Sequence, residues 1–92
     1  MSSAKHLVIH GRVQGVCYRA WFSELAEQMS LKGWVRNRHD GTVEAMISGS
    51  SDAVERMIMA AGTGPTLAEV KEVVANERDY DGPSGFEVRP TE

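Results

Sequence analysis

The sequence predicts an α+β sandwich in which two helices cover one face of an antiparallel sheet. Short runs with strand character alternate with two amphipathic stretches, in the order β-α-β-β-α-β plus a short final strand. Two helices for one sheet imply that both pack on the same face. A chain of 92 residues has the length of one domain, so we expect residues 1–92 to form a single domain.

The first half of the chain predicts a strand and a helix, separated by a glycine-bearing loop. The strand is predicted over Lys5–Gly11, a run of leucine, valine and isoleucine that ends at glycine. Helical spacing begins near Tyr18 or Arg19 and ends near Gly33. The apolar stripe of this helix repeats at i, i+4 and i+7, on Phe22, Ala26 and Met29.

The middle of the chain predicts a β-hairpin centred on Asp40 and Gly41, two residue types that suit a turn with positive φ at both positions. The second helix is predicted to begin at Ser50–Asp52, whose side chains can cap it. This order of elements is that of the ferredoxin-like sandwich, a fold that does not define a function by itself. The other strands are predicted at Trp34–His39, Thr42–Ser48, Leu67–Ala75 (which would also suit a helix) and Phe86–Arg89.

Composition and charge limit the possible partners. The net charge of −3 disfavours nucleic acid and anionic membranes, since both reward a basic surface. No apolar run approaches the roughly 18 residues of a membrane span, and no signal pattern opens the chain. Cys17 is the only cysteine, which excludes an internal disulfide and suits a reducing compartment. We therefore expect a cytoplasmic protein, and a monomer because no exposed apolar helix face is evident.

The segment "GRVQGVCYRAWF", Gly11 to Phe22, is the first candidate site. A helix N-terminus presents unpaired N–H groups and partial positive charge, and a glycine-bearing loop ahead of it can turn further N–H groups inward. Arg19 adds a planar set of donors that matches phosphate oxygens. Two interpretations stay open on this pattern: an anion cradle, or a plain turn beside a solvated arginine. Both the Walker and the G-x-G-x-x-G patterns are absent, which favours a small phosphate compound over a nucleotide.

Asn37 is the second candidate, because asparagine is disfavoured within a strand. Its amide could hold a water molecule, but the pattern alone favours an edge position or a local backbone bond. Arg36 and Arg38 alternate with Asn37 and are interpreted as a solvated face. Cys17 could be taken for a phosphatase nucleophile, but that chemistry needs a cradle around the thiol and an acid for the leaving group. The three histidines lack metal-ligand spacing, so no metal site is predicted.

"GRVQGVCYR" followed by "GWVRNRHDGTVE" resembles the acylphosphatases, and "AVERM", "GP" and "GFEVRP" are similar to that family as well. The resemblance implies a ferredoxin-like fold and hydrolysis of the carboxyl–phosphate bond of acyl phosphates, with neither metal nor cofactor. It implies that Arg19 binds the phosphate and Asn37 holds the attacking water. Ser30 departs from the family by replacing its usual glycine at a helix end, where we expect a small effect on stability. The backbone N–H groups of the cradle would come from Gly15, Val16, Cys17, Tyr18 and Arg19.

The expected partners are therefore an acyl phosphate as substrate and inorganic phosphate or sulfate as ligand, with neither nucleic acid nor membrane. One alternative is a non-catalytic module that binds a phosphorylated metabolite, but such a module has no need of a positioned water. Another is an RNA-binding domain on the same fold, which would read bases with strand aromatics. Here these are few, Trp34 and Phe86, and the net charge is negative.

Overall fold

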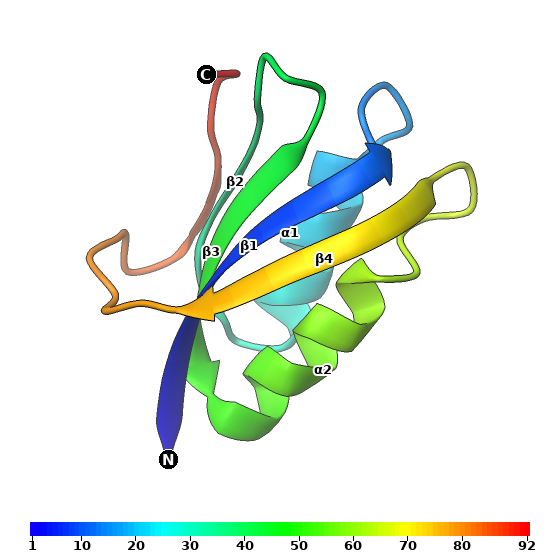
Figure 1. The fold of residues 1–92 in the computed structure, drawn as a ribbon. Helices are drawn as coiled ribbons and strands as arrows, with labels where there is room; N and C mark the ends of the chain where they lie inside the picture. Colours follow the sequence, from blue (N-terminus) through cyan, green and yellow to red (C-terminus); the bar gives the residue numbers. More distant parts are fainter.

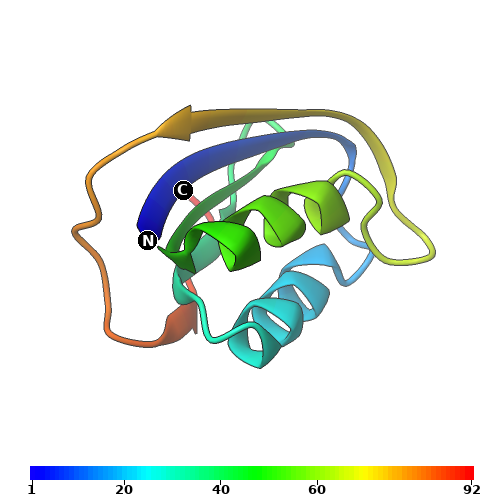
Figure 2. The same ribbon diagram turned by 90° about the horizontal axis from the view of Figure 1, so that it is seen from below.

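The structure, a computed structural model, describes residues 1–92 and confirms the predicted order of elements (Figure 1). Both helices lie on one face of a single sheet, which is the ferredoxin-like α+β arrangement (Figure 2). Neither helix is long and apolar enough to cross a membrane. The elements are β1 (Ser2–Arg12), α1 (Tyr18–Gln28), β2 (Lys32–Asn37), β3 (Val43–Ser50), α2 (Ser51–Ala61), β4 (Glu69–Glu77) and β5 (Phe86–Val88).

The sheet has the strand order β4-β1-β3-β2-β5. Strands β1 to β4 pair antiparallel, as expected, but β5 pairs parallel to β2, with Val88 beside Val35. The connection explains this departure from a fully antiparallel sheet. Strand β4 ends at the end of the sheet where β2 begins, and residues 78–85 cross to the opposite edge there (Figure 1). The chain therefore enters β5 in the direction of β2.

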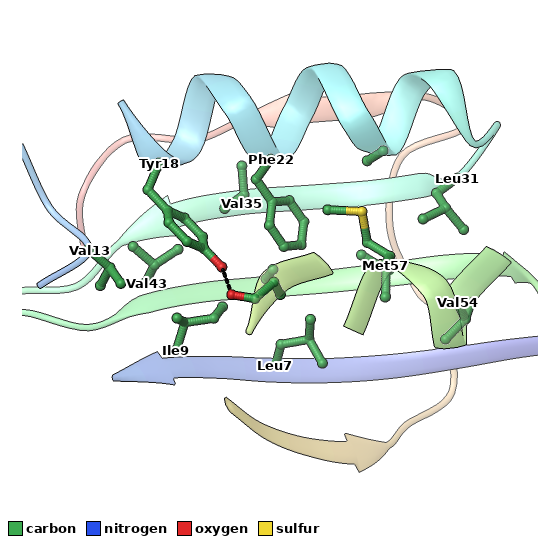
Figure 3. Close-up of a cluster of buried hydrophobic side chains, with 14 of the residues drawn as sticks. Leu7, Ile9, Val13, Tyr18, Phe22, Leu31, Val35, Val43, Val54 and Met57 are labelled. Atoms are coloured by element: carbon green, nitrogen blue, oxygen red, sulfur yellow. Dashed lines mark hydrogen bonds between the residues drawn. The ribbon is translucent and has the colours of Figure 1, made fainter. Parts of the chain in front are cut away.

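The core lies between the sheet and the two helices (Figure 3). Phe22 and Ala26, on the predicted stripe of α1, are fully buried, and Tyr18 at the start of this helix is buried as well. The Tyr18 hydroxyl donates a 2.7 Å hydrogen bond to the carbonyl oxygen of Ala61, which ties the start of α1 to the end of α2. Burial raises the pKa of Tyr18, so this hydroxyl stays protonated and keeps donating. The sheet contributes Leu7, Ile9, Val35, Val43, Ala45 and Ile47 to the core.

The β2–β3 turn differs from the one expected. Only Gly41 has a positive φ, of 93°, and Asp40 does not. The Asp40 carboxylate instead accepts hydrogen bonds from the Thr42 hydroxyl at 2.6 Å and from its backbone N–H at 2.9 Å. These bonds lower the pKa of Asp40 and hold the turn without a left-handed residue at position 40. The expectation of positive φ at both turn positions was wrong for Asp40.

The helix-free face of the sheet carries an ion-paired cluster. Glu44 accepts hydrogen bonds from His6 at 2.6 Å and from Arg36 at 2.8 Å, and Arg36 also pairs with Glu92 at 2.7 Å. Burial alone would raise the pKa of Glu44, but the bonds to His6 and Arg36 outweigh it and lower that pKa. Arg36 is thus half-buried and paired, and its interpretation as part of a solvated face was wrong.

Ser30→Gly is expected to stabilise the protein. Ser30 follows α1 with a φ of 57°, and its N–H and that of Leu31 bond to the carbonyls of Glu27 and Ala26, as in a Schellman motif. A Cβ in this left-handed conformation costs about 1–2 kcal/mol. The extra chain entropy of glycine offsets part of this, so chemical denaturation should show a gain of about 0.5–1 kcal/mol in the free energy of unfolding.

The matched control for Ser30→Gly is Ser23→Gly, in the middle of α1. There the backbone is already helical, so glycine should lower the free energy of unfolding by about 0.5 kcal/mol. Equal losses at both positions would contradict the left-handed strain assigned to Ser30.

Candidate active site

The loop between β1 and α1 exposes a run of unpaired backbone donors. Gly15 and Cys17 adopt left-handed conformations, with φ of 74° and 63°. None of the backbone N–H groups from Gly15 to Arg19 donates a hydrogen bond within the protein, whereas the N–H of Trp21 already bonds to the carbonyl of Cys17. A Cβ built on Gly15 would meet nothing within 4 Å, so the positive φ is what favours glycine there. The loop therefore offers several N–H groups to a ligand.

The N-terminus of α1 is also not neutralised, in contrast to that of α2. Helix α2 is capped by Ser50, whose hydroxyl accepts from the N–H of Ala53 at 3.2 Å, and it carries Asp52 in its first turn. Helix α1 has no side-chain cap and no acidic residue in its first turn. Its partial positive charge thus stays available to an anion at the loop.

Arg19, in the first turn of α1, lines a pocket of about 440 Å³. Arg19 is half-buried as a whole, and its guanidinium makes no ion pair and no hydrogen bond with the protein. The pocket also includes Asn37, so the two predicted residues line one pocket although they lie in separate elements. Val16, the one predicted cradle residue outside the lining, is buried in the core. The lining consists of Val13, Gly15, Cys17, Tyr18, Arg19, Ala20, Asn37 and Val88.

Asn37 ends β2 with a side chain that no protein group satisfies. Its Oδ1 is buried and has no hydrogen-bond partner. Its backbone carbonyl accepts from the N–H of Glu92 at 3.1 Å, so the main chain is held while the amide is free. Strand β2 lies between β3 and β5, so Asn37 is not on an edge strand, and its side chain makes no local backbone bond. The structure therefore shows neither of the two structural roles considered for it. A buried carbonyl oxygen without a donor costs about 1–3 kcal/mol, so it suits a site that binds a ligand or water.

Gln14 is a residue of the site region that sequence reasoning missed. Its Nε2 donates two hydrogen bonds of 2.8 Å, to the carbonyl oxygens of Arg38 and Thr42. Both carbonyls belong to the β2–β3 turn, next to Asn37, so Gln14 joins the loop that leads to Arg19 to the hairpin that carries Asn37. The available signal was a primary amide between two glycines, since an amide NH₂ group supplies two donors without a charge.

Gln14→Glu should loosen this connection, because it keeps the side-chain shape but replaces two donors by a carboxylate facing two carbonyls. We expect the free energy of unfolding to fall by about 2 kcal/mol. A slight displacement of the loop from Asn37 should lower kcat about tenfold, with a smaller change in KM. Chemical denaturation and steady-state kinetics measure the two effects.

The matched control is Gln28→Glu, an exposed glutamine at the end of α1. We expect it to change stability by no more than about 0.5 kcal/mol and kcat not at all. Normal kcat in Gln14→Glu would show that the two bonds do not position the loop.

Cys17 is exposed and lines the pocket beside Arg19. The pocket contains no carboxylic acid, which a cysteine-dependent phosphatase would need to protonate its leaving group. The structure thus brings together Arg19, Asn37 and the loop backbone, and it leaves the thiol without the acid partner that nucleophilic catalysis requires.

The fold and the pocket define a class: a ferredoxin-like α+β protein in which the first βα loop and the first hairpin line a common pocket with Arg19 and Asn37. The family model described as Acylphosphatase matches residues 5–88. An acylphosphatase of Acidiphilium cryptum (strain JF-5) is 46% identical over 88 residues, covering 96% of this chain and 97% of that protein. The chain belongs to the acylphosphatase family.

Solved structures agree with this assignment. The structure of an acylphosphatase from Coxiella burnetii matches with a TM-score of 0.92 at 33% identity, covering 96% of this chain and 93% of that chain. The acylphosphatase from Bacillus subtilis matches with a TM-score of 0.90 at 31% identity, covering 97% and 99%.

Proposed function

We propose that this member of the acylphosphatase family hydrolyses acyl phosphates with Arg19 and the Gly15–Arg19 backbone holding the phosphate and with Asn37 holding the attacking water. The reaction cleaves the carboxyl–phosphate bond and releases a carboxylate and inorganic phosphate. The observation that carries the residue assignment is the common pocket of Arg19 and Asn37, two residues from different elements with unpaired side chains.

The phosphate site rests on three sources of positive potential at one place. The unpaired N–H groups from Gly15 to Arg19 supply hydrogen bonds, the uncapped N-terminus of α1 supplies a dipole, and Arg19 supplies a full charge. Arg19 is also the only charged residue of the lining, so no carboxylate there opposes an anion. Inorganic phosphate and sulfate should bind at the same position.

The water site rests on Asn37. An amide can accept a hydrogen bond at Oδ1 and donate at Nδ2, so it fixes both the position and the orientation of a water molecule. A water held at this amide would face the phosphate bound at Arg19. Holding the two reactants in one geometry supplies a large part of the rate enhancement.

Beyond these two sites, the reaction needs only stabilisation of the charge that develops on the phosphate. As the water oxygen bonds to phosphorus, the bond from phosphorus to the acyl oxygen breaks and its electron pair leaves with the carboxylate. Negative charge spreads over the equatorial phosphate oxygens, where the N–H groups and Arg19 stabilise it. The proton of the attacking water passes to the phosphate itself, because no carboxylate and no histidine lines the pocket to accept it.

Hydrolysis of acetyl phosphate and benzoyl phosphate by the wild-type protein tests the proposal. Release of inorganic phosphate should exceed the buffer rate, and added phosphate should inhibit competitively. Absence of hydrolysis for both compounds would overturn it. We further propose that the protein acts as a cytoplasmic monomer, which size-exclusion chromatography with light scattering and fractionation of the source cells would test.

A further inference from the structure

The pocket has an apolar part that phosphate binding does not use. Besides Arg19, Asn37 and Gly15, its lining includes the apolar side chains of Ala20 and Val88. Ala20 is exposed on the first turn of α1, next to Arg19, and Val88 ends β5. Neither residue belongs to the core.

Val88 is placed beside Asn37 by the sheet. Strand β5 pairs with β2 in parallel, with Val88 beside Val35, and Asn37 lies two residues further on the same face as Val35. Phe86 shares this face and packs on Phe22, with ring centroids 5.9 Å apart. Val88 continues the row beyond the core, where it is 49% exposed. An exposed valine at the edge of a pocket is an apolar surface available to a ligand.

Charge is confined to the phosphate end of the pocket. Arg19 is the only charged lining residue, and no second cation and no acid line the remaining part. An acyl group with its own charge would find no charged partner there and would gain no apolar contact. An uncharged apolar acyl group would instead cover Val88 and Ala20.

From this lining we infer that Val88 and Ala20 form the wall that contacts the acyl group, and that the preferred substrates are phosphates of uncharged, apolar carboxylic acids. This inference rests on the proposed function, because the phosphate held at Arg19 sets where the acyl group lies. It names the substrate class that the phosphate site leaves undetermined. The wall discriminates by apolar contact area, so a larger apolar acyl group gains more from it than a methyl group.

The test compares kcat/KM for benzoyl phosphate and acetyl phosphate in wild type and Val88→Thr. Threonine keeps the shape of valine but has a hydroxyl in place of one methyl group, so it weakens apolar contact with little change in packing. Because the wall is open to solvent, the expected effect is modest. The ratio of kcat/KM for benzoyl phosphate to kcat/KM for acetyl phosphate should fall about threefold. Ala20→Ser, a second variant at an exposed helix position, should lower the same ratio in the same direction.

Val74→Thr is the matched control. Val74 is a valine of similar exposure, 36%, on β4 at the opposite edge of the sheet. Its substitution should leave the ratio unchanged. An unchanged ratio in both Val88→Thr and Ala20→Ser, or equal losses for the two substrates, would overturn the acyl wall while the proposed function stands. Absence of hydrolysis by wild type would overturn the proposed function itself.

Discussion

Arg19→Ala is expected to lower kcat/KM for benzoyl phosphate about 10³-fold. The substitution removes the only charged group of the pocket, which would bind the phosphate in the ground state and stabilise its equatorial oxygens in the transition state. Both KM and kcat should therefore suffer, KM by a rise and kcat by a fall. Steady-state kinetics measure the two parameters, and calorimetry with inorganic phosphate measures the loss of affinity without turnover.

Two further variants make the Arg19 experiment specific. Arg19→Lys keeps the charge but loses the planar set of donors, so it should recover only part of the lost rate. Arg12→Ala removes an exposed arginine at the end of β1, outside the pocket, and should change kcat/KM less than about twofold. A near-normal rate in Arg19→Ala would remove this residue from the mechanism.

Asn37→Ala is expected to lower kcat about 10²-fold or more while KM changes little. The side chain would act on the water and not on the phosphate, so its loss affects positioning in the transition state and leaves substrate binding nearly intact. This separation of kcat from KM distinguishes Asn37 from Arg19. A rise in KM as large as the fall in kcat would place the amide on the substrate instead of on the water.

The same variant should gain stability. The buried Oδ1 of Asn37 has no hydrogen-bond partner, so alanine removes a desolvated polar atom. Alanine also loses the packing of the amide, which offsets part of this gain. We expect a net rise of about 0.5–1 kcal/mol in the free energy of unfolding, measured by chemical denaturation. Asn76→Ala, at an exposed position of β4, should change neither stability nor rate. Destabilisation by Asn37→Ala would indicate a structural role for the amide.

Asn37→Ala is expected to lower kcat but to raise the free energy of unfolding, which reflects a general trade-off between ligand binding and stability. A pocket that presents unsatisfied donors and acceptors to a ligand gives up their internal hydrogen bonds. The Gly15–Arg19 loop does the same with its backbone N–H groups, and α1 lacks the serine cap that α2 has. The two helices of the protein thus begin differently because one is held by its own side chains and the other is left open to the pocket.

The sequence by itself was sufficient for features that depend on near neighbours along the chain. The stripe at Phe22 and Ala26 predicted the buried face of α1, and the cap of α2 was predicted within Ser50–Asp52, of which Ser50 supplies it. Arg19 was recognisable as a ligand-binding candidate because glycines and a helix start lie directly beside it. Hydrophobic period, capping and turn chemistry all act over a few residues, so they can be inferred from a single chain.

The tertiary structure alone decided which of these features meet. Whether Asn37 held a strand edge or faced a pocket depended on the strand order β1-β3-β2, which brings the end of β2 to the loop before α1. The two bonds of Gln14, the ion pairs of Arg36 and the parallel pairing of β5 likewise join residues distant in sequence. Such contacts follow from sheet register and packing, which no local pattern encodes.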